Sequence, residues 1–228
     1  MTAPDRSGRP SPPRPHARLE RSLGNDGHGS VAGLDEVGRG AWAGPVSVGI
    51  VVFQPDRRPP PGLRDSKLLT EPRREALFPL ITRWCTAWSV GHADPTECDD
   101  LGMTGALRVA ARRALDGLAA PPMVVLMDGN HDYVTDPASG GRPPDGSTPQ
   151  IRTIVRGDAT CISIAAASIV AKVTRDRLMR SLADSFPAFD FDRNKGYPSP
   201  AHRTALAGFG LTSLHRRSWS YVDDLAFR

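Results

Sequence analysis

The sequence predicts an α/β protein with a small helical segment at its C-terminal end. Five short runs of apolar, often β-branched residues, bounded by glycine, proline or aspartate, are typical of buried strands. Longer stretches between them repeat apolar residues at helical spacing. The last forty residues carry helix and turn signals but no further strand pattern. Strands that alternate with helices in this way favour a sheet covered by helices.

The expected elements follow one another along the chain with clear boundaries. The predicted strands cover residues 31–34, 46–53, 86–93, 123–127 and 151–155. The predicted helices begin after Thr70, cover residues 95–118 and 161–182, and end with a helix from N-cap Ser199 to Gly208. The small residues that open the helix at 161–182 suit close packing on a sheet. Residues 129–149 form a long loop rich in glycine and proline.

Composition divides the chain into a tail, a main domain and an appendage. Residues 1–30 hold five prolines and five arginines with few apolar side chains, so they predict a disordered tail. We expect an α/β domain over residues 31–185 and a helical appendage over residues 186–228. The net charge is +4, but the tail contributes 5 − 3 = +2 of it, so charge alone is weak support for an anionic partner.

The three cysteines are widely spaced and form no C-x-x-C pair. This argues against a disulfide framework or a zinc site and fits a reducing, cytoplasmic location. No apolar window of membrane-spanning length and no secretory signal occur, so no membrane contact is expected. A monomer is expected because no additional apolar stripe requires a partner.

Acidic residues end three of the predicted strands. Asp35 and Glu36 follow the first apolar run, Asp128 ends the fourth, and Asp158 follows the fifth. Binding sites of open α/β sheets lie where strands end, so these carboxylates are expected to converge. Together they would repel one another unless cations neutralise them. One geometric difficulty is that adjacent strand residues, such as Asp35 and Glu36, point to opposite faces.

Neither histidine nor cysteine accompanies these four acids in the motifs. Oxygen ligands alone favour hard cations such as Mg²⁺ or Mn²⁺ over Zn²⁺. Two such ions about 4 Å apart form the usual clamp for in-line displacement at a phosphodiester. The pattern therefore predicts a metal site for phosphodiester chemistry.

Several motifs, in this order along residues 31–219, resemble bacterial ribonuclease HII. They are Asp35-Glu36-Val-Gly-Arg-Gly followed by Ala-Gly-Pro, Asp65-Ser66-Lys67, Asp128-Gly129-Asn130, Arg156-Gly157-Asp158, Ala166-Ala167-Ser168 through Lys172 to Asp176, Lys195-Gly196-Tyr197 and His215-Arg216-Arg217-Ser218. The resemblance implies an RNase H-like fold with a central mixed sheet flanked by helices. It also implies metal-dependent cleavage of RNA in RNA–DNA hybrids, and incision 5′ of single ribonucleotides in duplex DNA during ribonucleotide excision repair, leaving 3′-hydroxyl and 5′-phosphate ends.

The resemblance also assigns roles to residues. It makes Asp35, Glu36, Asp128 and Asp158 the catalytic acids that hold two divalent cations, Mn²⁺ or Mg²⁺. It makes the loop Gly38-Arg39-Gly40 the reader of the ribose 2′-hydroxyl, the group that distinguishes RNA from DNA. It makes Tyr197 the aromatic that stacks on the following deoxyribose. The remaining substrate contacts that it implies are Lys67, Lys172 and Ser168.

Alternatives remain open at this stage. The same acids would serve a DNA-junction nuclease of related fold, although such an enzyme needs no 2′-hydroxyl reader. A hybrid-binding module without catalysis is the third candidate, although all four acids are present. His202 and His215 could be general bases, but we expect them to be structural. The sequence departs from the family at Asn194, at Ala41-Trp42 and in the long 129–149 loop.

Overall fold

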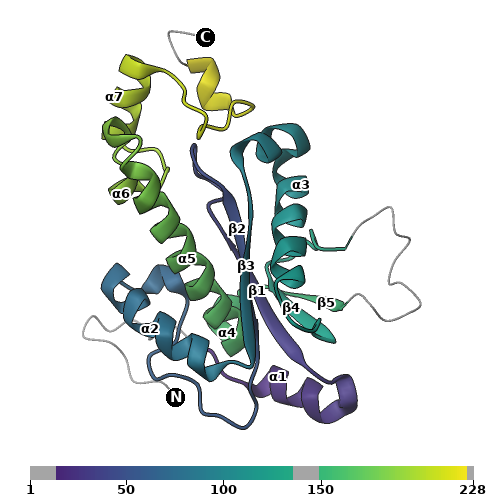
Figure 1. The fold of residues 1–228 in the computed structure, drawn as a ribbon. Coiled ribbons are helices and arrows are strands. Elements are labelled where there is room, and N and C mark those ends of the chain that lie inside the picture. Colours follow the sequence, from purple (N-terminus) through teal and green to yellow (C-terminus); the bar gives the residue numbers. More distant parts are fainter. Residues whose placement is uncertain (1–13, 136–148, 225–228) are drawn as a thin grey trace, which may run out of the picture.

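A mixed five-stranded sheet forms the centre of the computed structural model, which describes residues 14–135 and 149–224 (Figure 1). The strand order is β3-β2-β1-β4-β5. The central strand β1 (Val31–Val37) pairs antiparallel with β2 (Val46–Val52) and parallel with β4 (Val124–Asp128). The outer strand β3 (Ala87–Ala93) is antiparallel to β2, and β5 (Gln150–Ile154) is parallel to β4. The predicted α/β fold with a mixed sheet is confirmed.

Helices cover both faces of this sheet (Figure 1). The long helix α5 (Ile162–Ala183) packs on one face together with α2 (Glu71–Trp84), and α3 (Pro95–Asp116) packs on the other. The shorter α-helices are α1 (Arg18–Leu23), α4 (Gly157–Thr160), α6 (Phe191–Asn194) and α7 (Pro200–Phe209). Single helical turns of other types are η1 (Gly24–His28), η2 (Ser66–Leu68), η4 (Pro187–Phe189) and η5 (Ser220–Asp224).

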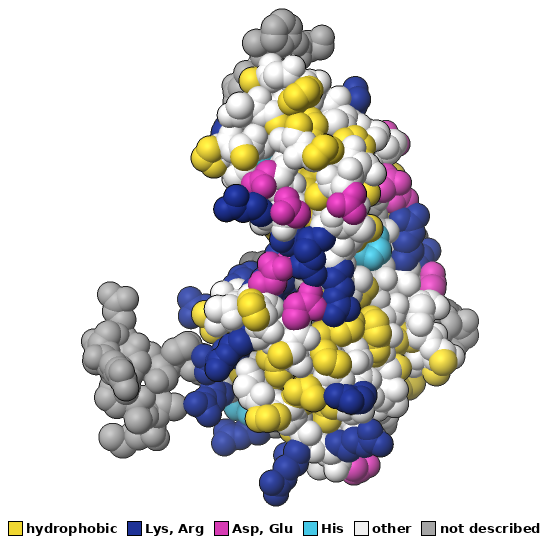
Figure 2. Space-filling model, turned by 60° about the vertical axis from the view of Figure 1, so that its left-hand side comes forward, with side chains coloured by type: hydrophobic (Ala, Val, Ile, Leu, Met, Phe, Trp, Pro, Cys, Tyr) yellow, Lys and Arg dark blue, Asp and Glu magenta, His cyan; other side chains and the backbone are white. Residues whose placement is uncertain are grey.

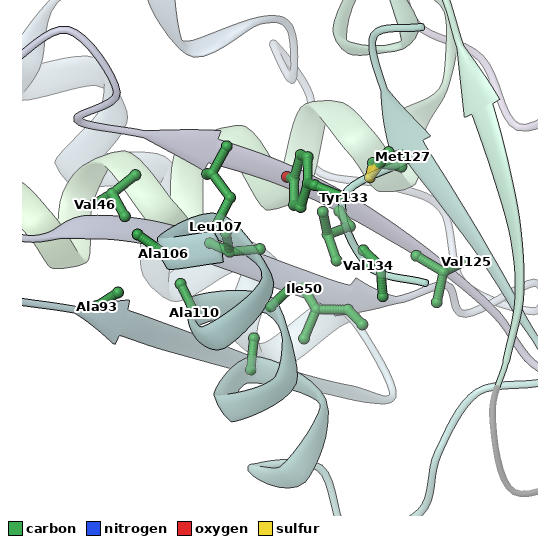
Figure 3. Packing of buried hydrophobic residues seen from close by; sticks show 14 of the residues in the cluster. Val46, Ile50, Ala93, Ala106, Leu107, Ala110, Val125, Met127, Tyr133 and Val134 are labelled. Carbon is green, nitrogen blue, oxygen red and sulfur yellow. The ribbon is translucent and has the colours of Figure 1, made fainter. Parts of the chain in front are cut away.

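The alternation of side chains along β2 divides the core into two layers. Val46, Val48 and Ile50 pack on the side of α3, whereas Val51 packs with α2 and α5. Figure 3 shows the first layer, in which Tyr133 lies over the sheet beside α3. Because β2 is covered on both faces, all of its residues are buried, and Ser47 is the one polar side chain among them.

Small residues let α5 approach the sheet closely, as the sequence predicted. A Cβ atom added to Gly33 of β1 would lie 2.1 Å from the backbone carbon of Ser163, so only glycine fits there. Residues 165–167 at the start of α5 are alanines that are fully buried against the same face. This contact holds the start of α5 against β1, two residues before Asp35.

Two expected helix boundaries need correction. The helix predicted over residues 95–118 is interrupted at Gly102, whose φ of 66° and ψ of 172° are not helical. The last helix does not stop at Gly208 but continues to Phe209, and Gly210 adopts the positive φ of 72° that ends it. The predicted cap at Ser199 is confirmed, because its side chain accepts a hydrogen bond from the backbone N–H of His202.

The predicted disorder of residues 1–30 is wrong for the part of this segment that the structure describes. Residues 18–23 form α1, and Leu23 packs in a cluster with Val31, Leu126 and Ile164. The buried carboxylate of Glu20 accepts hydrogen bonds from the backbone N–H of Ser163 at 2.9 Å and from its hydroxyl at 2.8 Å. These contacts are tertiary, so the composition of the segment does not reveal them. Residues 1–13 lie outside the described part.

The C-terminal residues pack on the end of α5 and on the connection between β1 and β2. Phe189, Phe191 and Leu206 form a cluster with Ala43 and Met179. Figure 1 shows α6 and α7 beyond the C-terminal half of α5. The division into domains at residue 185 stays a prediction, since this cluster joins both sides of that boundary.

Two further expectations concern helices and cysteines. No helix in residues 14–135 or 149–224 is long and apolar enough to span a membrane. Cys85, Cys98 and Cys161 are all buried and free.

The contact between α1 and α5 gives a test of the folded N-terminal segment. We expect Glu20→Ala to lower the free energy of unfolding by about 1–3 kcal/mol, because it removes charge-assisted hydrogen bonds at the N-terminus of α5. Urea denaturation followed by circular dichroism measures the change. The exposed neighbour Arg21 provides the control Arg21→Ala. Equal stability of the Glu20 and Arg21 variants would show that α1 does not support α5.

Candidate active site

The strand pairing brings the predicted acids to one end of the sheet. The parallel register of β1 and β4 pairs Leu34 with Met127, so that the next residues, Asp35 and Asp128, follow on neighbouring strands. Asp158 lies in α4, directly after β5. Parallel strands that end at the same edge therefore deliver acids from separate parts of the chain.

A pocket of about 250 Å³ opens at this edge. It collects three of the four predicted acids, the glycine-rich loop, two lysines and Tyr197. The residues that line it are Asp35, Glu36, Val37, Gly38, Arg39, Gly40, Ser66, Lys67, Arg74, Asp128, Lys172 and Tyr197. Asp158 does not line the pocket but is joined to it, because Lys67 Nζ lies 3.5 Å from its Oδ2 atom.

Backbone N–H groups hold the carboxylates in place. Asp128 Oδ1 accepts hydrogen bonds from Gly157 N at 2.7 Å and from Asp158 N at 3.4 Å. Asp35 Oδ1 accepts from Glu36 N at 2.9 Å. The first pair of bonds connects the end of β4 to the start of α4, so the position of Asp158 depends on Asp128.

Burial and neighbouring charges raise the pKa values of two of the acids. Burial raises the pKa of Asp35 well above its ordinary value, and the negative charges of Glu36 and Asp128 raise it further. Burial and the charge of Asp158 likewise raise the pKa of Asp128. Burial lowers the pKa of Lys67, but neighbouring carboxylates, led by Asp35, outweigh this effect and the net pKa is raised. The pocket therefore has a strong electrostatic preference for cations.

Glu36 lines the pocket although its side chain lies on the face of β1 opposite to that of Asp35. Both residues are paired regularly with β2, which confirms that they alternate. The pairing of β1 with β4 ends at Leu34, so beyond that residue this edge of β1 is no longer covered by β4. On its own face, Glu36 accepts a hydrogen bond from the Tyr133 hydroxyl at 3.1 Å. Its other oxygen lies 3.5 Å from Arg39 Nη1.

Two fully buried arginines shape the loop Gly38-Arg39-Gly40. Arg216 donates hydrogen bonds to the carbonyl oxygens of Gly38 at 2.7 Å and Arg39 at 3.0 Å. Gly38 has a φ of 85°, and an added Cβ would lie 2.2 Å from Nε of Arg175, so a side chain there would collide. Arg216 thus holds the carbonyl groups of the loop from the protein interior, and the loop lines the pocket on its other side.

Arg175 connects this loop to the turn that carries Tyr197. It donates hydrogen bonds to the carbonyl oxygens of Pro45 at 2.8 Å, Ala43 at 3.2 Å and Lys195 at 2.9 Å. The carbonyl oxygen of Gly196 accepts from the N–H groups of Trp42 and Ala43 at 2.9 and 3.1 Å. The half-buried Tyr197 ring thus lies at the pocket on a backbone that is bound to the loop.

Two of the basic residues that line the pocket are held by one carboxylate outside the acidic group. Lys172 Nζ donates to Asp176 Oδ1 at 2.7 Å and lies 6.0 Å from the centre of the Tyr197 ring. Arg74 Nη2 lies 3.8 Å from Asp176 Oδ2. Asp176 is thus a buried anchor shared by two cations that line the pocket.

Acidic and basic side chains also interleave on the face that carries α2 and α5 (Figure 2). Arg180 binds both Glu71 and Glu75, and Glu75 also binds Arg177. Lys195 Nζ lies 3.6 Å from Glu71 Oε2. This network connects α2 and α5 with the turn that precedes Tyr197.

The structure places Ser168 behind the pocket, and its contact with substrate stays a prediction. Its side chain is buried at 2% exposure and does not line the pocket. Its hydroxyl donates to the Ala165 carbonyl at 2.9 Å and accepts from Ser66 N at 3.2 Å. Ser168 therefore fixes the Asp65-Ser66-Lys67 segment, and Lys67 extends from there toward the acids.

The structure confirms that His202 and His215 are structural. Both are buried, and their Nε2 atoms lie 2.9 Å apart. At the departures from the family pattern, Asn194 accepts from Gly196 N at 2.8 Å, and Trp42 stacks on Tyr221 with ring centres 4.2 Å apart. Neither departure alters the acids.

Sequence reasoning missed Tyr133, Arg74 and the role of Arg216. Tyr133 lies in a glycine- and proline-rich loop with no periodic pattern, so nothing in the sequence connects it with Glu36. Arg74 is one arginine among many. Lys172 and Asp176 did carry a signal, since a spacing of four places them on one helix face.

The donor set fits divalent cations. All four acids offer oxygen, and the raised pKa values of Asp35 and Asp128 show a repulsion that a cation would relieve. In the described part of the chain, however, no three His, Cys, Asp or Glu side chains are close enough together to hold an ion as they stand. Binding an ion would therefore require the carboxylates to turn toward one another.

Sequence comparison places this arrangement among known proteins. The family model described as ribonuclease HII matches residues 32–222. A ribonuclease HII from Streptomyces griseus subsp. griseus is 51% identical over 215 residues, which cover 92% of this chain and 86% of the relative. A ribonuclease HII from Paracoccus denitrificans is 45% identical over 211 residues, covering 92% of this chain and 94% of the relative.

Solved structures agree with this result. The ribonuclease H2 from Pyrococcus horikoshii OT3 has a TM-score of 0.67 at 27% identity, covering 86% of this chain and 96% of that chain. The structure of Bst-RNase HIII in complex with Mn²⁺ has a TM-score of 0.59 at 17% identity, covering 85% of this chain and 68% of that chain, and supports the fold alone.

The crowding of acids predicts that the pocket lowers stability when no metal is present. Folding raises the pKa of Asp35. The free energy of unfolding therefore has its full contribution from Asp35 at low pH, where the side chain is protonated, and loses it as the pH rises through the pKa of the folded state. We therefore expect Asp35→Asn to raise the free energy of unfolding at pH 7, in chelator, by about 0.5–2 kcal/mol. Urea denaturation at pH 7 and pH 4 measures this, and the gain should shrink at pH 4.

Asp56, an exposed loop acid, provides the control Asp56→Asn, which should change stability little. A loss of stability in Asp35→Asn at pH 7 would contradict the proposed repulsion.

Proposed function

The chain belongs to the ribonuclease HII family and is a metal-dependent ribonuclease that acts on RNA–DNA hybrids, and from this premise we propose that it also incises duplex DNA on the 5′ side of single embedded ribonucleotides. The products would be 3′-hydroxyl and 5′-phosphate ends. The observation that carries this proposal is the convergence of acids, a glycine-rich loop and Tyr197 in one pocket.

We assign the catalytic and metal-holding role to Asp35, Glu36, Asp128 and Asp158. They would hold two divalent cations, Mg²⁺ or Mn²⁺. Such cations, when bound, activate water for in-line attack and stabilise the charge that develops on the phosphate. The backbone N–H groups of Gly157 and Asp158 keep Asp128 in position for this task. Lys67 neutralises part of the negative charge, and we assign to it a contact with a substrate phosphate.

Recognition of the junction is assigned to the loop Gly38-Arg39-Gly40 and to Tyr197. The loop lies at the pocket with no side chains on Gly38 and Gly40, so its backbone can approach a ribose 2′-hydroxyl closely. We assign stacking on the deoxyribose that follows to the Tyr197 ring, which lines the same pocket. Lys172 lies beside this ring, and we assign to it a contact with the phosphate between the two sugars.

These groups all come from one chain, so we propose that the protein acts as a monomer. The activity would serve the removal of ribonucleotides from DNA in the cytoplasm.

A cleavage assay tests the proposed chemistry. On a duplex with one embedded ribonucleotide, in Mg²⁺ or Mn²⁺, we expect the wild type to cut 5′ of the ribonucleotide. We expect Asp128→Asn to lose at least about 100-fold in rate, because a cation ligand loses its charge while its volume is kept. Thermal denaturation controls for folding. A rate near that of the wild type in saturating Mg²⁺ would overturn the assignment of the acids.

A comparison of two substrates tests the role of Tyr197. Stacking on a nucleic acid contributes roughly 1–3 kcal/mol, so Tyr197→Ala should slow cleavage of the embedded ribonucleotide by about one to two decades. A continuous RNA–DNA hybrid should lose less, because it has no deoxyribose at that position. Side-by-side values of kcat/KM, with circular dichroism for folding, measure the difference. Equal losses on both substrates would exclude junction reading by Tyr197.

A further inference from the structure

A chain of hydrogen bonds with a defined direction runs through the C-terminal segment to Tyr197. The backbone N–H of Thr212 donates to Nδ1 of His215 at 3.0 Å. An Nδ1 atom that accepts carries no hydrogen, so the neutral His215 ring has its hydrogen on Nε2. That Nε2 lies 2.9 Å from Nε2 of His202 and must donate to it. His202 then carries its hydrogen on Nδ1, which donates to the Tyr197 carbonyl oxygen at 3.0 Å.

The surroundings keep this pair of histidines neutral. His202 is 0% exposed and His215 is 1% exposed, and the rings of Phe189 and Phe191 pack against both. Burial and the charge of Arg203 lower the pKa of His202, although its hydrogen bond with the Tyr197 carbonyl opposes this. Burial, His202 and Arg217 lower the pKa of His215 to about 3. Both rings are therefore neutral at pH 7, and the chain of hydrogen bonds keeps its direction.

The two ends of this chain of hydrogen bonds lie next to the two groups that we propose recognise the junction, the Gly38-Arg39-Gly40 loop and Tyr197. His215 forms an isolated β-bridge with Ala43, in the connection after the Gly38-Arg39-Gly40 loop. Its neighbour Arg216 holds the carbonyl groups of that loop. His202, in the first turn of α7, holds the carbonyl of Tyr197. The histidine pair thus spans the distance between the loop and the aromatic ring.

We propose that His202 and His215 are positioning residues that set Tyr197 relative to the Gly38-Arg39-Gly40 loop and thereby determine selectivity for the RNA-to-DNA junction. This inference rests on the proposed function, because it requires that Tyr197 reads the junction. Neither histidine lines the pocket, so both act through Tyr197 and not on the substrate.

Two substitutions of His202 separate its two hydrogen bonds. The amide of Asn occupies the place of Nδ1, so His202→Asn keeps a donor for the Tyr197 carbonyl and loses the bond to His215. The amide of Gln reaches the place of Nε2, so His202→Gln keeps the His215 bond and loses the bond to Tyr197. The readout is the ratio of kcat/KM on an embedded ribonucleotide to kcat/KM on a continuous hybrid, with circular dichroism for folding.

We expect His202→Gln to lower this ratio by about three- to tenfold, the effect of one neutral hydrogen bond, and His202→Asn to leave it within about twofold. In the Tyr197→Ala background, His202→Gln should cause no further loss, because both changes act on the same contact. Equal ratios in the Gln and Asn variants, or an additional loss in the double variant, would overturn the proposal.

The outcome for Tyr197→Ala alone distinguishes the two levels of inference. If Tyr197→Ala lowers the ratio and His202→Gln does not, Tyr197 reads the junction but the two histidines do not position it. If Tyr197→Ala leaves the ratio unchanged, both inferences are wrong.

A measurement on the wild type needs no variant to fold. Long-range ¹H–¹⁵N spectra at pH 7 should show His202 as the Nδ1–H tautomer and His215 as the Nε2–H tautomer. Two Nε2–H tautomers, or a charged ring, would overturn the proposed chain of hydrogen bonds through His215 and His202.

Discussion

Repulsion among carboxylates at the ends of β1, β4 and β5 is the constraint on which this structure depends. The parallel pairing places Asp35 and Asp128 on neighbouring strands, and burial increases the free-energy cost of ionising them. The chain offsets part of this cost with backbone donors to Asp128 and with Lys67 beside Asp158. The remaining repulsion is the physical basis for cation binding, because a site fully neutralised by its own side chains would have little affinity for a divalent ion.

A second set of charges is buried for a different purpose. Arg175 and Arg216 are fully buried, and they donate to backbone carbonyl groups of the connection between β1 and β2 and of the turn before Tyr197. An unpaired buried guanidinium would be strongly unfavourable, so these hydrogen bonds are required for folding as well as for the shape of the loop. The same contacts bind the C-terminal segment to the N-terminal strand. The proposed recognition of substrate would therefore use backbone that is held in place by buried side chains.

The N-terminal helix α1 contributes to the same rigidity from the far end of α5. Glu20 satisfies the N-terminus of α5 through Ser163, which rests on β1 at Gly33. Further along α5, Ser168 supports the segment of Lys67, and Lys172, Arg175 and Asp176 contact the pocket region. One helix thus connects the N-terminal segment, the segment of Lys67 and the turn that carries Tyr197. A shift of α5 would change the position of all of them together.

The sequence by itself determined the α/β fold class, the approximate place of every strand and the four acids, because apolar runs, glycine boundaries and acidic strand ends are local signals. Its ordered motifs also identified the family. Only the tertiary structure decided that Glu20 orders part of the predicted tail, that Ser168 supports Ser66, and that Tyr133 reaches Glu36. In each case the deciding contact joins residues about one hundred or more positions apart. Such contacts depend on how the sheet and α5 pack, and no local pattern of residues encodes them.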